Sequence, residues 1–228
     1  MINVLIVHYN TPELTEACVK SINKHTPNCK IYIFDNSDKR PFTAKFDNVE
    51  IIDNTKGQII NFDEWLEQFP ERFLHKNPVV LNSWGSAKHC VSIQQALGLI
   101  KDPVVLLDSD VLIKRDFSEI CDAKYICCGE RMNQAHFKER ILPFLCFINT
   151  PMMITFGINY FNGKKMHGLS NSGHHYDTGG SFNEELKSKN LSIKNIKVSD
   201  FCVHLKRGSW RDYENIPEFL LQYKYYYL

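Results

Sequence analysis

The chain has no surplus of positive or negative charge, and this absence limits the classes of partner that it could bind. The 228 residues carry 27 basic and 26 acidic side chains, which gives a formal net charge of +1. Nucleic-acid binding usually rests on a concentrated positive field, and no long basic run supplies one. We therefore expect no nucleic-acid partner. With 43% hydrophobic residues the chain can bury a sizeable core, which favours one domain of residues 1–228.

Long apolar segments are missing as well. The N-terminus begins with the apolar run 1–7, which is too short for a membrane span and has no charged leader of the kind that a signal peptide carries. Internal repeats, low-complexity tracts and linkers rich in proline or glycine are absent too. These absences favour a compact cytoplasmic protein.

Paired cysteine motifs are the third absence. None of the eight cysteines forms a C-x-x-C pair, and several lie in apolar segments. A disulfide scaffold and a zinc site are therefore unexpected, and a reduced chain fits better. The adjacent Cys127 and Cys128 fit either a redox pair or a buried strand, and we favour the strand.

What the chain does contain is an alternation of strand-like and helix-like segments over its first half. Residues 3–8 and 30–34 are β-branched apolar runs, and between them Thr11 and Pro12 form a cap and a first helical position. Such a βαβ unit places its two strands parallel in one sheet. Residues 49–52 predict a third strand.

The pattern changes further along the chain. Residues 83–86 open a second predicted helix, whereas residues 54–82 have no clear period and suggest a helical insertion or a lid. After residue 123 a strand at 125–128 is followed by apolar segments without a helical period and by the polar, glycine-rich run 162–180. We place a boundary near Val111, inside one compact body.

Two carboxylates end a strongly apolar strand. Asp108, Ser109 and Asp110 follow the run 103–107, which reads as a strand buried on both faces. Two carboxylates at that position must either pair with a cation or face solvent, because burying an unpaired charge is costly. Hard oxygen ligands suit Mg²⁺ or Mn²⁺, and these ions keep positions open that a diphosphate can fill. The pattern predicts a metal–nucleotide site, with a pair of caps in a strand-to-helix turn as the alternative.

These features occur in an order that resembles one family of enzymes. The first half is similar to the glycosyltransferases of family 2, which have the GT-A fold, in the following segments: residues 4–10, 35–37, 85–89 and 108–110. The resemblance implies an α/β fold of GT-A type, with a Rossmann-like, mostly parallel central sheet flanked by helices. Residues 1–111 would then form the nucleotide-sugar-binding half and residues 112–228 the acceptor-side half. Two departures from the family pattern are Asn36, where many relatives have a second acid, and His89, where Asn is common.

The resemblance also implies a donor site. Asp110 is the expected direct metal ligand, His204 the third ligand, and Asp108 reaches the ribose or the metal. The expected nucleotide contacts are Tyr9, Asn10, Asp35, Lys88, Asp108, Ser109, Lys206 and Arg207. Simpler interpretations stay open: Asp35 as a turn residue, Thr11 as a helix cap, His204 as a core histidine, and the basic pair as a solvated loop.

Asp177 is the expected catalytic residue. The segment 176–180 looks like the acceptor-side motif of related enzymes, where a carboxylate takes the proton of the acceptor hydroxyl during inverting transfer. Glu184 or Glu185 is the alternative base, and a loop carboxylate without a function is the simpler one. Residues 204–210 also have a likeness to the His…Lys-Pro-Trp motif of retaining GT-A enzymes, which leaves the stereochemistry open.

The function that follows is sugar transfer. We expect a glycosyltransferase of hexosyltransferase type that uses Mn²⁺ or Mg²⁺ and moves a sugar, with inversion, from a UDP-sugar to a hydroxyl of a glycan or lipid-linked acceptor. A retaining GT-A glycosyltransferase is the alternative. Polysaccharide assembly at the cytoplasmic face of a membrane would fit. A sugar nucleotidyltransferase needs glycine after the first strand, and residues 9–14 have none. A non-catalytic nucleotide- or glycan-binding module is the third alternative.

The tyrosine-rich tail 219–228 packs on the body, forms an oligomer contact or touches a membrane, and we favour packing.

Overall fold

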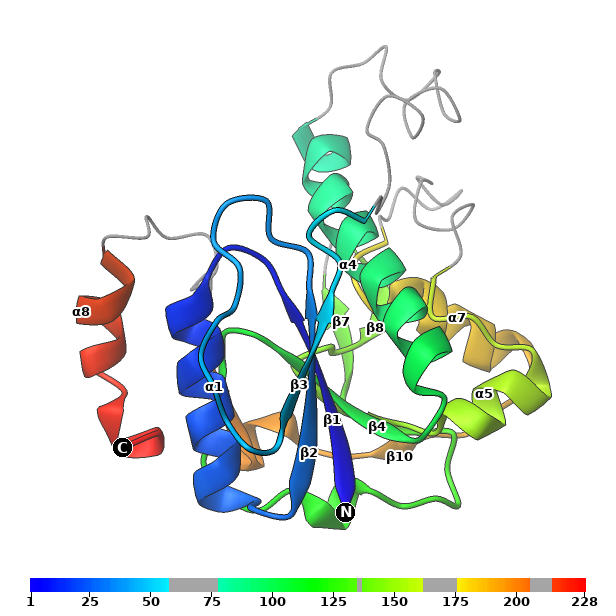
Figure 1. Cartoon of the computed structure of the whole chain (residues 1–228). Coiled ribbons are helices and arrows are strands. Elements are labelled where there is room, and N and C mark those ends of the chain that lie inside the picture. The colour runs from blue at the N-terminus through cyan, green and yellow to red at the C-terminus, as the bar shows by residue number, and fades with distance from the viewer. Residues whose placement is uncertain (58–77, 135–136, 162–175, 206–214) are drawn as a thin grey trace.

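A mostly parallel sheet forms the centre of the computed structural model (Figure 1), which describes residues 1–57, 78–134, 137–161, 176–205 and 215–228, and of residues 78–84 the backbone alone. Its seven strands lie in the order β10-β6-β9-β4-β1-β2-β3. They are β1 (Ile2–His8), β2 (Cys29–Asp35), β3 (Val49–Asp53), β4 (Val104–Asp108), β6 (Cys127–Gly129), β9 (Leu145–Ile148) and β10 (Lys194–Asn195). The predicted fold class, a mostly parallel sheet flanked by helices, is confirmed.

One strand of the sheet runs against the others. β1 pairs in parallel with both β2 and β4, whereas β9 is antiparallel to β4 on one side and to β6 on the other. β9, β6 and β10 come from beyond the predicted boundary, so the second half of the chain extends the same sheet. Two strand pairs lie outside it: β5 (Val111–Ile113) with β11 (Cys202–His204), and β7 (Arg131–Gln134) with β8 (Phe137–Ile141).

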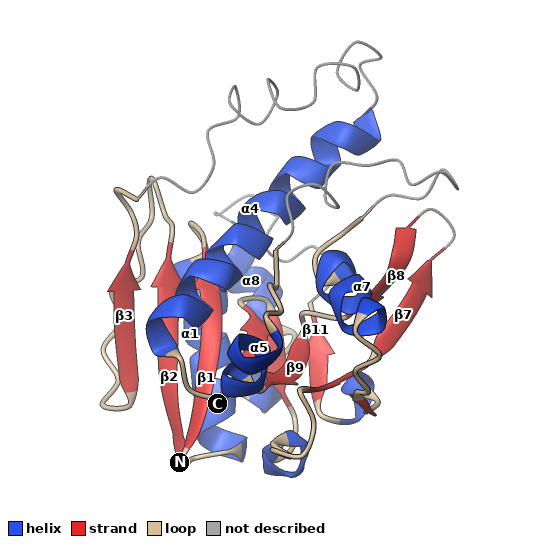
Figure 2. Cartoon of the chain, turned by 90° about the vertical axis from the view of Figure 1, so that its right-hand side faces the viewer, coloured by secondary structure: helices blue, strands red, loops and turns tan. Residues whose placement is uncertain are grey.

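Helices cover both faces of the sheet (Figures 1 and 2). α1 (Pro12–His25) packs on one face through Cys18, Val19 and Ile22, together with the short helices η1 (Ser118–Ile120) and η2 (Val198–Asp200). The other face is covered by α4 (Pro78–Ile100), α5 (Thr150–Phe156) and α7 (Gly180–Ser188). The core therefore lies in two apolar layers, one on each side of β1 and β4.

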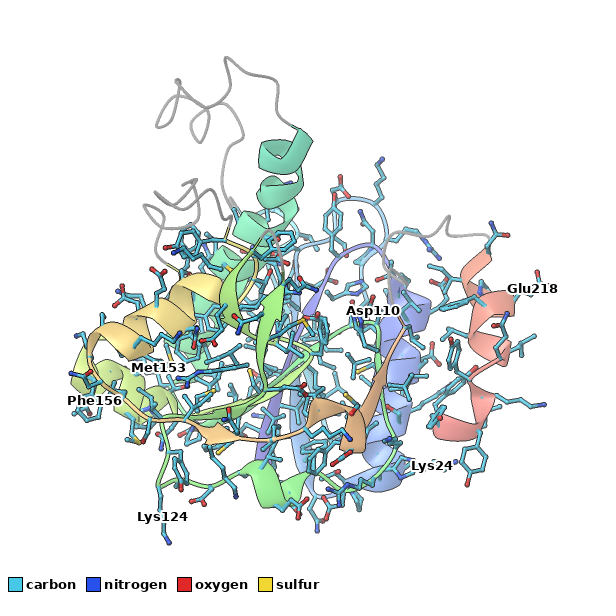
Figure 3. All side chains as sticks on the ribbon, turned by 180° about the vertical axis from the view of Figure 1, so that it is seen from behind. Lys24, Asp110, Lys124, Met153, Phe156 and Glu218 are labelled. Atoms are coloured by element: carbon cyan, nitrogen blue, oxygen red, sulfur yellow. The ribbon has the colours of Figure 1, made fainter. Side chains whose placement is uncertain are left out.

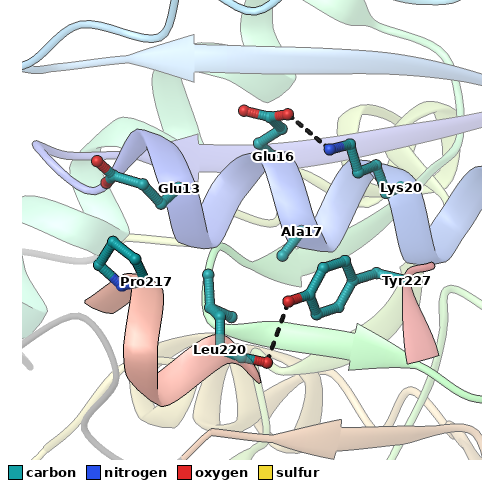
Figure 4. A pocket seen from close by; sticks show the side chains of 7 residues that line it. All are labelled: Glu13, Glu16, Ala17, Lys20, Pro217, Leu220 and Tyr227. Atoms are coloured by element: carbon teal, nitrogen blue, oxygen red, sulfur yellow. Dashed lines mark hydrogen bonds and ion pairs between the residues drawn. The ribbon is translucent and has the colours of Figure 1, made fainter. Parts of the chain in front are cut away.

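The tail packs on α1. α8 (Ile216–Leu221) and η5 (Lys224–Tyr226) form a third apolar cluster with Leu14 and Ala17 of α1. A cavity of about 210 Å³ lies between α1 and α8 (Figure 4), beside the Glu16–Lys20 ion pair. Among the described residues, no helix is long and apolar enough to cross a bilayer.

Several boundaries differ from the predicted ones. α4 begins at Pro78, so residues 83–89 lie inside the helix and do not start it. The start was missed because residues 78–81 are proline and β-branched or apolar residues, which are typical of a strand. Residues 152–156, which lack a helical period, belong to α5, where Asn149 caps the helix by accepting from the Met152 amide at 3.2 Å. Most of the segment 54–82 lies outside the described residues.

Thr11 occupies the predicted cap position without acting as the predicted cap. α1 begins at Pro12, but no helix amide bonds to the Thr11 hydroxyl. That hydroxyl instead donates to the Tyr9 carbonyl oxygen at 3.4 Å. Proline at the first helical position has no N–H, so this helix start has one fewer amide without a partner inside the helix.

A matched pair of isoleucines tests the central sheet. Ile33 and Ile51 face each other in the β2–β3 register, but Ile33 is fully buried while Ile51 is 42% exposed. We expect Ile33→Ala to lower the free energy of unfolding by about 2–5 kcal/mol, because it leaves a cavity. Ile51→Ala should cost less than about 1 kcal/mol. Urea denaturation measures both, and equal losses would contradict this packing.

Candidate active site

Three side chains with metal-ligand chemistry meet at the carboxyl end of β4. Asp108 ends that strand, Asp110 lies between β4 and β5, and His204 is the last residue of β11. One ligand atom from each lies within 4.8 Å of the others. Figure 3 places Asp110 near one end of the sheet, far from Lys124 at the other end. The expected ligand set is therefore brought together in space.

The long-range pairing of β5 with β11 delivers His204 to this place. In the register, His204 lies opposite Val111, the residue that follows Asp110. The Leu205 amide donates to the Asp110 carbonyl oxygen at 2.9 Å, and His204 Nε2 lies 3.3 Å from Asp110 Oδ1. Phe144 stacks on the imidazole, with ring centroids 3.8 Å apart and an interplanar angle of 9°. Phe144 thus covers one face of the ring and Asp110 contacts its Nε2, which holds the imidazole in place.

The two carboxylates of this site lie close together, and their charges shift the pKa values of the groups around them. Burial raises the pKa of Asp108, His89 and His204 oppose the rise, and the charge of Asp110 adds to it. For His204, burial lowers the pKa, but the hydrogen bond and charge of Asp110, with the charge of Asp108, raise it above its ordinary value. The two crowded carboxylates therefore stabilise the positively charged form of His204.

An unused oxygen shows that the site fits a cation. Asp108 Oδ1 is buried and accepts no hydrogen bond from any described residue; His89 Nε2 lies 3.6 Å away, beyond hydrogen-bond distance. A buried carboxylate oxygen without a partner is costly. Two carboxylates and one imidazole are a ligand set that Mn²⁺ or Mg²⁺ accepts. The chemistry of these residues therefore fits a divalent metal.

Asn10 organises the loop beside this site. Its backbone is left-handed, with φ of 56°, directly after β1. The side-chain oxygen accepts from the amides of Lys39 and Arg40, each at 3.0 Å, and the side-chain nitrogen donates to Asp38 at 2.5 Å. The Asn10 amide donates to Ser37. Asn10 therefore joins the turn after β1 to the turn after β2.

Asp35 has the same kind of local role. It is buried at the end of β2, where Oδ1 accepts from the Ser37 amide at 2.9 Å and Oδ2 from the Phe42 amide at 2.8 Å. Both oxygens thus hold the loop after β2, as the turn interpretation expects. A nucleotide contact by Asp35 stays a prediction. Tyr9, by contrast, is 49% exposed beside this loop.

Asp177 lies in a dense network with two other elements. Its Oδ2 is ion-paired with Arg140 of β8, and its Oδ1 accepts from the Ser86 hydroxyl of α4 at 2.5 Å and from the Thr178 amide at 2.7 Å. Both carboxylate oxygens are therefore engaged. This network lies near the metal-ligand cluster, because α4 carries both Ser86 and, one turn later, His89, whose Nε2 is 3.6 Å from Asp108 Oδ1.

Gly179 lets this network form. Its φ is +85°, and a Cβ there would lie 2.0 Å from the Ile141 carbonyl oxygen. Only glycine combines that backbone conformation with so close an approach. The turn before α7 is thereby held against β8, which places Asp177 beside Arg140.

The sequence analysis assigned no role to three residues of this region. Ser86 and His89 are three apart on α4, so they lie on one face of the helix, toward Asp177 and Asp108 respectively. That spacing was a usable signal once the helix was placed. Arg140 gave no signal, because it stands in a segment of mixed charge whose partner is 37 positions away.

The remaining expected residues fall into two groups. Ser109 is buried between the two acids, and Lys88 is half-buried on α4. Glu184, the alternative base, accepts from the Tyr176 hydroxyl at 2.6 Å. Lys206 and Arg207 lie outside the described part of the chain.

Comparisons with known proteins bear on the fold. No family model matches the chain, and no curated protein sequence matches it. Among solved structures it is similar to the galactosyltransferase LgtC in complex with donor and acceptor sugar analogs, with 13% identity over 86% of this chain and 73% of that one and a TM-score of 0.50. An active-site mutant of LgtC gives the same values. GlyE of Streptococcus pneumoniae TIGR4 follows, with 11% identity over 86% of this chain and 46% of that one and a TM-score of 0.46.

The likeness to LgtC shows the fold: the chain has a GT-A-like glycosyltransferase fold. Membership of family 2 in particular stays a prediction, since no family model supports it.

A pair of aspartates tests the loop-holding role of Asp35. Asp35 and Asp53 face each other in the β2–β3 register, but Asp35 is buried and Asp53 is exposed, with its oxygen bonded within its own turn to Thr55. We expect Asp35→Asn to lower the free energy of unfolding by about 1–3 kcal/mol, because one of the two amide donors loses its acceptor. Asp53→Asn should change it by less than about 0.5 kcal/mol. Urea titration measures both, and a neutral Asp35→Asn would refute the role.

Proposed function

We propose that the protein is a metal-dependent glycosyltransferase that moves a sugar from a nucleoside diphosphate sugar, a UDP-sugar, to a hydroxyl acceptor. The observation that carries the proposal is the convergence of Asp108, Asp110 and His204 at the end of a central parallel strand in a GT-A-like fold. LgtC, with the same kind of fold, was solved with donor and acceptor sugar analogs. A pair of ligands of that kind is what we propose here.

The donor would bind along the carboxyl ends of β1, β2 and β4. In open α/β sheets this edge is where ligands lie. The loops after β1 and β2 are tied together by Asn10, and Tyr9 offers a half-exposed ring beside them for a nucleobase. Lys88, Ser109, Lys206 and Arg207 are the further nucleotide contacts that we propose. A preformed loop reduces the entropy lost when the nucleotide binds.

Asp110, Asp108 and His204 would hold Mn²⁺ or Mg²⁺. When bound, such an ion neutralises charge on the leaving diphosphate, an effect worth several kcal/mol. The protein's own part is to keep the ligands in place. Stacking by Phe144 and the β5–β11 pairing fix the imidazole, and the burial of Asp110 limits water around the carboxylate. Positioning of this kind contributes much of the acceleration in bond-forming steps.

Asp177 is the proposed acceptor-side residue, and its role depends on the stereochemistry. As the base of an inverting transfer, it would take the proton of the acceptor hydroxyl and so lose the negative charge that pairs with Arg140. In a retaining transfer, an oxygen of the leaving diphosphate can take that proton, and Asp177 would hold a sugar hydroxyl instead. The engagement of both its oxygens by Arg140, Ser86 and Thr178 favours the retaining alternative.

The wider setting follows from the same proposal. The acceptor would be a glycan or a lipid-linked sugar, and the enzyme would work at the cytoplasmic face of a membrane in polysaccharide assembly. One domain would contain both a nucleotide-sugar-binding half, 1–111, and an acceptor-side half, 112–228. Hexosyl transfer is the reaction type that we propose.

Metal-dependent nucleotide binding is the first test. We expect UDP to bind the wild type in the presence of Mn²⁺, and Asp110→Asn to weaken that binding by at least about 10–100-fold, the loss typical of residues that only support a metal ligand. Asp102→Asn, an exposed aspartate just before β4, is the matched control and should bind as the wild type does. Isothermal titration calorimetry measures all three.

The two ways of failing have different meanings. Equal binding by the wild type and Asp110→Asn would remove Asp110 from the ligand set. Absence of any Mn²⁺-dependent UDP binding by the wild type would contradict the proposed function as a whole.

The configuration of the released sugar is the second test. A panel of UDP-glucose, UDP-galactose and UDP-N-acetylglucosamine is incubated with the enzyme and Mn²⁺, and proton NMR records the first anomer formed by hydrolysis before it mutarotates. Because Asp177 is held on both oxygens, we expect the configuration of the donor to be retained. The inverted anomer would instead assign Asp177 the role of base.

A further inference from the structure

Arg140 forms a buried ion pair that the expected site residues do not explain. It lies on β8, in the hairpin of β7 and β8, and its side chain is only 10% exposed. Nη1 donates to Asp177 Oδ2, whereas Nε is buried and has no hydrogen-bond partner among the described residues. The guanidinium is thus committed to one carboxylate and keeps a donor unused.

Stability alone is a poor reason for such a pair. Taking two charges out of water costs several kcal/mol per ion, and the attraction between them often fails to repay that cost. A buried N–H without an acceptor adds a further cost. Groups that are expensive to bury and incompletely bonded are concentrated at functional sites. The pair is therefore better explained by what it does to Asp177.

Three elements hold the pair in one geometry. β8 supplies Arg140, α4 supplies Ser86, and the turn before α7 supplies Asp177. Gly179 fixes the distance between the turn and β8, and the Ile141 amide donates to the Gly179 carbonyl oxygen at 3.4 Å. The Asp177 carboxylate consequently has little freedom to rotate, and its orientation depends on Arg140.

The pair also faces the metal-ligand cluster. Ser86 lies one helical turn before His89 on α4, and His89 Nε2 is 3.6 Å from Asp108 Oδ1. One helix face therefore contacts the acceptor-side carboxylate and a donor-side carboxylate together. Under the proposed function, the sugar of the donor would lie between these two carboxylates.

We propose that Arg140 is a positioning residue, which holds the Asp177 carboxylate in the orientation that receives a hydroxyl of the substrate sugar. The proposal rests on the proposed function. It adds the β7–β8 hairpin to the active site and assigns its buried arginine to the sugar and not to the nucleotide.

The variants Arg140→Met and Arg140→Lys separate this role from a structural one. We expect Arg140→Met to lower kcat for hydrolysis of the best UDP-sugar of the panel by about 100-fold, as a misplaced contact group does. UDP affinity with Mn²⁺ should not fall, because the nucleotide contacts are elsewhere. Arg140→Lys should regain part of the loss, since it keeps the charge without the planar fork.

Arg131 on the same hairpin provides the matched control. Its Nε donates to Asn183 of α7 at 3.0 Å and lies 3.9 Å from Glu139, so it points to other partners than Asp177. Arg131→Met should keep the wild-type kcat. The double variant Arg140→Met/Asp177→Asn removes both charges of the pair, and we expect it to fold and bind UDP with Mn²⁺ but not to turn over the donor. Circular dichroism and thermal unfolding confirm that each variant is folded.

The outcomes separate the inference from the function on which it rests. Wild-type kcat in Arg140→Met, or an equal loss in Arg131→Met, would overturn the positioning role alone. A parallel loss of UDP affinity in a folded Arg140→Met would assign the arginine to the nucleotide and also overturn it. No hydrolysis of any UDP-sugar by the wild type would contradict the proposed function, and with it this inference.

Discussion

Crowding of negative charge at the end of β4 is the constraint on which the rest of the site depends. A strand that is fully buried along its apolar length ends in two carboxylates, and the second of them, Asp110, is buried too. Three surrounding groups oppose that negative charge: His204 on β11, His89 on α4, and Arg140 at longer range. Each comes from a different element, so the strand pairings that position these elements also set the charge balance.

The sequence predicted what depends on local pattern. Apolar runs and a cap followed by proline were enough to place β1, α1 and β2 nearly to the residue, because those signals act within a few positions. The two acids after β4 were equally visible. The partners of those acids were harder to predict, since the proximity of Arg140 to Asp177 depends on a close backbone approach at Gly179, which has no signature in a single sequence. α4 was misplaced at its start because apolar residues around a proline suit a strand as well as a helix.

Residues with polar side chains at this edge divide into two kinds. Asn10 and Asp35 direct their side-chain hydrogen bonds to the loops that carry them. Asp108 keeps an unused buried oxygen. A polar residue at a strand end is thus a weak guide to function by itself. Its hydrogen bonds show whether it shapes the site or is available to a ligand.

The reversal of β9 has a consequence for how the edge of the sheet can change. Because β9 runs against β4, with Leu145 opposite Leu107, the residue before β9 lies where β4 ends, and Phe144 reaches His204. The edge is therefore built from two sources: segments that follow parallel strands and one that precedes an antiparallel strand. Substitutions before β9 can reshape the wall of the site while the strand ends that carry the carboxylates keep their register.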